Sequence, residues 1–91
     1  MKRAKVKVNN PYGMHARVAY KFTSLGERFI SNIKVGRSPQ KLEANGKDIM
    51  DILALGIGNG STLVIEAVGE DEKEAVDSLV ELVNSLGDDG D

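Results

Sequence analysis

The stretch that decides the fold class is STLVIEAVGEDEKEAVDSLVELVNSL, residues 61–86. Over Ser61 to Val68 the residues alternate, with Leu63, Ile65 and Ala67 on one face, which is the pattern of a half-buried strand. After this strand the apolar spacing changes to the three- and four-residue intervals of an amphipathic helix. The apolar positions of that helix are Ala75, Val76, Leu79, Val80, Val83 and Leu86. A strand with one apolar face, followed by a helix with one apolar face, is typical of an α+β fold with two layers.

The same two patterns recur toward the N-terminus. Residues 2–8 alternate as a strand, and the turn formers of residues 9–13 end it. An apolar stripe then predicts a helix over about residues 16–28. Residues 30–35 follow as a second strand. Each of these elements has one apolar face to bury.

The middle of the chain carries weaker signals. Residues 36–39 form a predicted turn, and residues 40–44 a short third strand. Residues 48–53 predict a helix of about two turns that ends near Gly56. The resulting order is βαββαβα, with helices on one face of an antiparallel sheet and water on the other. We expect one domain over residues 1–86 and a disordered acidic tail over 87–91.

The composition excludes several classes of protein. A chain of 91 residues provides one domain. It contains no Cys, which excludes a disulfide scaffold, a thiolate metal site and a cysteine nucleophile. No apolar run approaches the ~20 residues that span a bilayer, and no signal-type stretch follows the basic start. We therefore expect a soluble, cytoplasmic monomer without membrane insertion.

The charges point to protein partners. The net charge of −2 argues against nucleic-acid binding, which needs a surface patch rich in Lys and Arg. All but one of the 12 Lys and Arg residues precede Asp48, and all but two of the 14 acidic residues lie from Asp48 onward. A small domain with two separated signs of charge suits electrostatically steered encounters with other proteins.

His15 is the only histidine, and it stands immediately before the predicted first helix. There the backbone N–H groups of Ala16, Arg17 and Val18 have no intrahelical partner, so they can bind an anion, above all phosphate. The Arg17 guanidinium adds a permanently charged donor. The pattern thus fits a histidine nucleophile with a cradle for a phosphoryl group. It also fits an ordinary surface histidine beside a solvated arginine, and the spacing alone does not decide between them.

Two segments resemble a known family. Residues 13–19, Gly-Met-His-Ala-Arg-Val-Ala, resemble the active-site signature of the HPr family, the histidine-containing phosphocarriers of the bacterial phosphoenolpyruvate-dependent phosphotransferase system. Residues 46–56 resemble the regulatory-serine segment of that family. The resemblance covers residues 2–86 and implies an open-faced two-layer β-sandwich, with a four-stranded antiparallel sheet covered on one face by three helices. The order read from the sequence agrees with this fold.

The resemblance implies a phosphocarrier, a covalent intermediate in a relay rather than a stand-alone turnover enzyme. Enzyme I, charged from phosphoenolpyruvate, would transfer a phosphoryl group to Nδ1 of His15. The carrier would then pass the group to a histidine on the A subunit of a sugar transporter. Arg17 and the amides at the helix start would hold the dispersed negative charge of the transition state. The resemblance implies neither a metal nor a cofactor in the carrier itself.

The resemblance also implies a surface for partner docking beside the histidine. The residues assigned to it are Met14, Ile49, Met50 and Leu53. A short helix must also bury part of its own surface. We therefore expect Ile52 and Leu55 to face the core, and Met50 and Leu53 to lie at the exposed patch.

Two residues depart from the family pattern. Val18 stands where the family usually has proline, and it allows a more mobile first helical turn. Asp48 stands where many relatives carry a serine that a dedicated kinase phosphorylates. That kinase cannot phosphorylate a carboxylate, so we expect this switch to be absent. Asp48 then either stabilises a helix start or permanently imitates phosphoserine.

These departures keep a second function open. The chain could be a regulatory interaction module that binds a transcription factor or a kinase through the same fold and patch. In that case Asp48 would be a fixed negative charge in place of the regulatory serine. The presence of His15 and Arg17 together favours the phosphoryl relay.

Overall fold

The computed structural model describes residues 1–39 and 42–85 of the chain. Its elements are β1 (Lys2–Lys7), α1 (Ala16–Gly26), β2 (Asn32–Arg37), β3 (Ala44–Asn45), α2 (Ile49–Ala54), β4 (Thr62–Val68) and α3 (Glu72–Ser85). The predicted order βαββαβα is confirmed. The expected tail over 87–91 lies outside the described residues. Within the part that is described, no helix is both long and apolar enough to cross a membrane.

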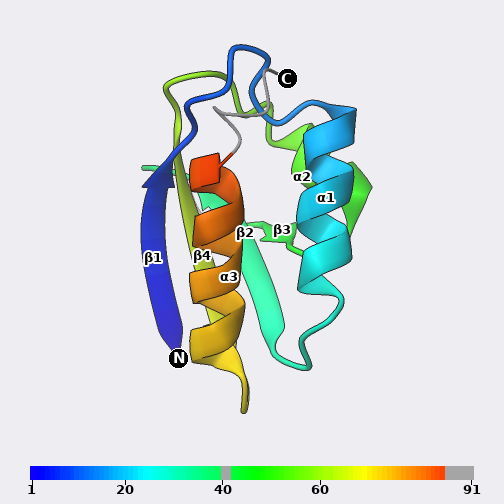
Figure 1. The fold of residues 1–91 in the computed structure, drawn as a ribbon, viewed down its shortest axis with the longest axis vertical. Helices are drawn as coiled ribbons and strands as arrows, with labels where there is room; N and C mark the ends of the chain where they lie inside the picture. The colour runs from blue at the N-terminus through cyan, green and yellow to red at the C-terminus, as the bar shows by residue number, and fades with distance from the viewer. Residues whose placement is uncertain (40–41, 86–91) are drawn as a thin grey trace.

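The four strands form one antiparallel sheet in the order β1-β4-β2-β3. The strand β4 lies at its centre, paired with β1 on one side and β2 on the other. The helices cover one face of this sheet, as Figure 1 shows. The start of α1 and the start of α3 lie at opposite ends of the molecule (Figure 1).

The core fills the space between the sheet and the helices. On β4, Leu63, Ile65 and Ala67 are fully buried, as their alternation predicts. Phe22 of α1 and Leu79 of α3 are also fully buried and pack into the same cluster. Burying an aliphatic or aromatic side chain of this size contributes about 1.5–3 kcal/mol. The sheet and both long helices are therefore held by one shared apolar layer.

The open face of the sheet is polar. Lys5 and Lys7 of β1 and Lys34 of β2 are exposed there. Arg3 forms an ion pair with Glu66 of the neighbouring strand, with 2.7 Å between Nη2 and Oε2. This face meets water, as expected for an antiparallel sheet with helices on one side.

The strands β2 and β3 differ from the sequence prediction by more than one residue at an end, whereas β1 and β4 differ by one residue. The strand β2 covers residues 32–37 rather than 30–35, because Gly36 and Arg37 continue to pair with β4. The predicted turn at residues 36–39 was therefore wrong at its first two positions. The strand β3 contains only Ala44 and Asn45, since Lys34 and Val35 alone pair with it. Residues 40 and 41 of the predicted third strand lie outside the described residues.

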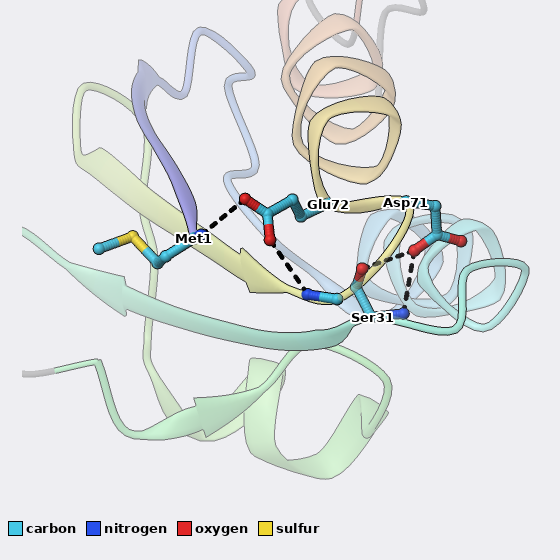
Figure 2. Close-up of polar contacts among 5 residues, drawn as sticks. Met1, Ser31, Asp71 and Glu72 are labelled. Carbon is cyan, nitrogen blue, oxygen red and sulfur yellow. Dashed lines mark hydrogen bonds and ion pairs between the residues drawn. The ribbon is translucent and has the colours of Figure 1, made fainter.

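The late start of β2 results from a contact with the beginning of α3 (Figure 2). The backbone N–H of Ile30 donates to Oδ2 of Asp71 at 2.9 Å, and the N–H of Ser31 donates to Oδ1 at 3.0 Å. The Ser31 hydroxyl also donates to Oδ1. Glu72, the next residue, accepts from the Gly69 N–H and forms an ion pair with the amino group of Met1. Three parts of the chain therefore meet at two adjacent carboxylates.

Asp71 makes the stability of this end depend on pH. The Ser31 hydroxyl, and then the N–H groups of Ile30 and Ser31, lower the pKa of Asp71 below its ordinary value of 3.8. The stabilisation is therefore present above that pH and is lost as the pH falls through the folded-state pKa. We expect Asp71→Asn to lower the free energy of unfolding at neutral pH. The difference from wild type should shrink below pH 3.8, measured by urea unfolding.

Asp77→Asn is the matched control for this prediction. Asp77 forms an ion pair with Lys73, one turn earlier on α3, and both side chains are exposed. Exposed pairs of this kind contribute little to stability because water screens them, so this variant should lose less stability than Asp71→Asn. A difference between Asp71→Asn and wild type that stays constant through the acid range would contradict the prediction.

Candidate functional site

The loop between β1 and α1 is held by a buried side chain and a close backbone contact. The fully buried Asn10 accepts the N–H of Tyr12 through Oδ1 at 2.9 Å and the N–H of Gly13 through its carbonyl at 2.9 Å. Gly13 has φ +64°, and a Cβ there would lie 2.3 Å from the carbonyl oxygen of Ile57. Only glycine combines this conformation with this approach. The loop therefore ends in a defined position against the segment before β4.

Met14 lies inside this arrangement. Its N–H donates to the Ile57 carbonyl at 2.9 Å, and its side chain is 4 % exposed within the core cluster. The assignment of Met14 to an exposed docking surface was therefore wrong. The backbone bond to Ile57 turns the side chain inward, and adjacency to His15 in the sequence could not reveal this.

His15 is the N-cap residue of α1, as its position in the sequence predicts. Its backbone is extended, with φ −74° and ψ 176°, and its side chain makes no capping hydrogen bond. The Ala19 N–H closes the first helical turn by donating to the His15 carbonyl at 2.8 Å. The N–H groups of residues 16–18 precede this first intrahelical bond, so they lie at the positive end of the helix dipole.

The two ring nitrogens of His15 have different surroundings. Nε2 is buried, and it is the only such side-chain nitrogen or oxygen of the described residues without a hydrogen-bond partner. Nδ1 is not among the buried atoms that lack a partner, and the residue as a whole is half-buried. The Tyr12 ring lies in edge contact with the imidazole, with 5.9 Å between centroids and 89° between planes.

The first turn of α1 presents backbone and cationic donors near this ring. Ala16 and Arg17 are exposed, whereas the Val18 side chain is 1 % exposed and packs into the core. Val18 is the third residue of α1, the position where the family pattern usually has proline. A helix start with an arginine in its first turn is suited to bind a phosphate group. Among residues 1–39 and 42–85, no cluster of His, Cys, Asp and Glu could hold a metal ion.

The helix α2 lies beside α1 and carries the predicted apolar patch. Met50 is 69 % exposed, and Ile49 and Leu53 are half-buried. Ile52 is fully buried, as predicted, whereas Leu55 is half-buried at the edge of the core. Met50 is thus the exposed member of this set, whereas Ile49 and Leu53 pack partly against the core, which the sequence did not predict for Leu53. We call these three residues the α2 patch.

Asp48 is the N-cap residue of α2. Its Oδ1 accepts from the Met50 N–H at 2.9 Å and from the Asp51 N–H at 3.3 Å. The interpretation that Asp48 stabilises a helix start therefore has a direct structural basis. The residue is also exposed, which leaves its charge at the surface beside Met50.

Sequence reasoning missed the part that Asn10 and Tyr12 play in the site. It interpreted residues 9–13 only as a turn that ends the first strand. Asparagine side chains often accept a hydrogen bond from the backbone N–H two residues later, which forms an Asx turn. The asparagine at position 10 is consistent with such a turn, but the sequence does not show that the turn brings the Tyr12 ring against His15.

Comparison with known proteins agrees with this geometry. A family model described as the PTS HPr component phosphorylation site matches residues 2–85. The chain belongs to the HPr family. It is 39 % identical over 90 residues to phosphocarrier protein HPr of Pseudomonas putida, with 99 % of each chain covered. It is 35 % identical to the HPr-like protein Crh of Halalkalibacterium halodurans, over 91 % of this chain and 96 % of that one. An HPr crystal structure from Thermoanaerobacter tengcongensis superposes with a TM-score of 0.88 at 36 % identity, covering 97 % of both chains.

The cap geometry makes a prediction for Asp48. Asp48→Ala removes the acceptor of two N–H groups of α2, so we expect the free energy of unfolding to fall by about 0.5–2 kcal/mol. Asp48→Ser keeps a capping oxygen and should remain close to wild type. Urea unfolding of the three proteins measures both effects. Equal stability of the alanine and serine variants would show that the cap contributes nothing.

Proposed function

We propose that this HPr-family chain is a phosphocarrier that accepts a phosphoryl group on Nδ1 of His15. The donor is Enzyme I, charged from phosphoenolpyruvate, and the acceptor is a histidine on a transporter subunit. The observation that carries the proposal is the position of His15 at the N-cap of α1, with Nε2 buried and without a hydrogen-bond partner. Membership of the HPr family supports the same chemistry.

The transfer requires few groups from the protein. The lone pair of Nδ1 attacks phosphorus while the bond from phosphorus to the donor breaks, and the ring proton stays on Nε2. The transition state spreads negative charge over the three phosphoryl oxygens. We expect the N–H groups of residues 16–18 and the Arg17 guanidinium to stabilise this charge, because they belong to the first turn after His15. The same groups serve the onward transfer, because it passes through the same kind of transition state.

The α2 patch is the surface we propose for docking. It lies on the helix next to α1, and its centre is the exposed side chain of Met50. Asp48 and Asp51 add negative charge at the start of α2. A matching partner therefore needs an apolar contact surface with basic residues facing these two carboxylates.

Phosphorylation by Enzyme I tests the proposal. With phosphoenolpyruvate and the cognate Enzyme I, the wild-type protein should gain one phosphate that is labile in acid and stable in base. His15→Ala should gain none, because no other histidine exists in the chain. Mass spectrometry of the intact protein measures the adduct. If Enzyme I is phosphorylated and the wild-type protein is not modified, the relay is excluded.

Arg17 provides a second test. We expect Arg17→Ala to slow phosphoryl transfer by about 10²-fold, the typical effect of removing one donor from a transition-state charge. Its melting temperature should change little, because the residue is exposed. Arg3→Ala, on the open face of the sheet, should leave the transfer rate unchanged. A loss of stability in Arg17→Ala that accounts for the slower transfer would instead assign Arg17 a structural role.

A regulatory module is the second candidate, favoured by the exposed charge of Asp48 and by the similarity to Crh. If Asp48 acts as a fixed negative signal that weakens docking of Enzyme I, Asp48→Ser should accelerate phosphorylation by Enzyme I while keeping the helix cap. Stopped-flow rates of wild type and this variant decide the question. Equal phosphorylation rates for wild type and Asp48→Ser would show that Asp48 only caps α2 and does not weaken the docking of Enzyme I.

A further inference from the structure

Tyr12 is an aromatic side chain with an unusual combination of exposure and contact. It is 69 % exposed, yet its ring meets the His15 imidazole edge to face. This is an arrangement that aromatic rings prefer. Tyr20, also a tyrosine on this part of the chain, is similarly exposed at 65 %. Burial in the core therefore cannot explain the position of the Tyr12 ring.

The backbone holds Tyr12 in place. Its N–H donates to the side chain of Asn10, which is fully buried, and the next residue is the conformationally restricted Gly13. The Met14 N–H then anchors the chain to Ile57. Tyr12 and His15 therefore lie at the two ends of a short segment. Contacts of Tyr12, Gly13 and Met14 hold this segment in place. Their ring contact follows from this segment.

The two ring nitrogens of His15 differ in their surroundings. In an unhindered histidine side chain, Nε2 is the less crowded nitrogen, because Nδ1 lies next to the substituted ring carbon. In this protein Nε2 is buried, whereas Nδ1 is not among the buried atoms that lack a partner. A group that covers the Nε2 side of the ring therefore selects the site of phosphorylation.

We propose that Tyr12 is a positioning residue that fixes the His15 ring and shields Nε2, so that phosphorylation occurs at Nδ1. The proposal rests on the function proposed above, because it concerns the same histidine. Tyr12 itself exchanges no proton or phosphoryl group. It acts through the orientation of the imidazole, and its hydroxyl is not required.

A chemical phosphoryl donor tests this without Enzyme I. Phosphoramidate transfers its phosphoryl group to histidine: the lone pair of a ring nitrogen attacks phosphorus, the P–N bond of the donor breaks, and ammonia leaves. The proton of the imidazole stays on the other nitrogen. NMR of phosphorus and of the labelled imidazole nitrogens distinguishes the Nδ1 adduct from the Nε2 adduct. Thermal unfolding confirms that each variant is folded.

The expected results form a set of four proteins. Wild type and Tyr12→Phe should give only the Nδ1 adduct, because both keep the ring. Tyr12→Ala should give a second signal from the Nε2 adduct. Tyr20→Ala, an equally exposed tyrosine replaced in the same way, should behave as wild type. An Nε2 adduct in wild type, or only the Nδ1 adduct in Tyr12→Ala, would overturn the proposal.

This experiment separates two kinds of failure. If phosphoramidate gives the predicted adducts but Enzyme I does not phosphorylate the protein, the role of Tyr12 stands and the relay fails. If Enzyme I phosphorylates the protein while Tyr12→Ala keeps only the Nδ1 adduct, the relay stands and the role of Tyr12 fails.

Discussion

The site depends on one close backbone approach, that of the loop after β1 to the segment before β4. Gly13 packs against the carbonyl of Ile57, and the Met14 N–H donates to the same carbonyl at 2.9 Å. This double contact brings the chain to the start of α1 at a fixed angle, so the next residue, His15, becomes the N-cap. Without it, the only histidine would have no defined relation to the helix dipole or to the Tyr12 ring.

The site is chemically simple because the fold supplies most of what a phosphoryl group needs. The long helix α1 is held by a core stripe that includes Val18 and Phe22, so its N–H groups at the start are preorganised. The cluster around Asp71 fixes the other end of the molecule through the start of α3. The carboxylates of Asp71 and Glu72 thus lie at the end of the molecule opposite the start of α1 (Figure 1).

Much of the fold could be predicted from the sequence, because each element buries one face and its apolar residues follow the period of a helix or a strand. The position of His15 could be predicted too, since turn formers and a helical stripe define the helix start locally. The start of β2 could not, because it depends on Asp71, 40 residues from Ser31. The burial of Met14 likewise depends on a distant residue, because its N–H donates to the carbonyl of Ile57. The ring contact of Tyr12 with His15 depends on the position that the loop takes after this contact.

The central claim is that a phosphoryl group on His15 is held by the first amides of α1. The most direct measurement compares the backbone amide chemical shifts of the protein before and after phosphorylation of His15. The account predicts that Ala16, Arg17 and Val18 show the largest downfield changes of their N–H protons, as new hydrogen bonds to phosphoryl oxygens form. Unchanged amides at these three positions, with the phosphate on His15, would contradict it.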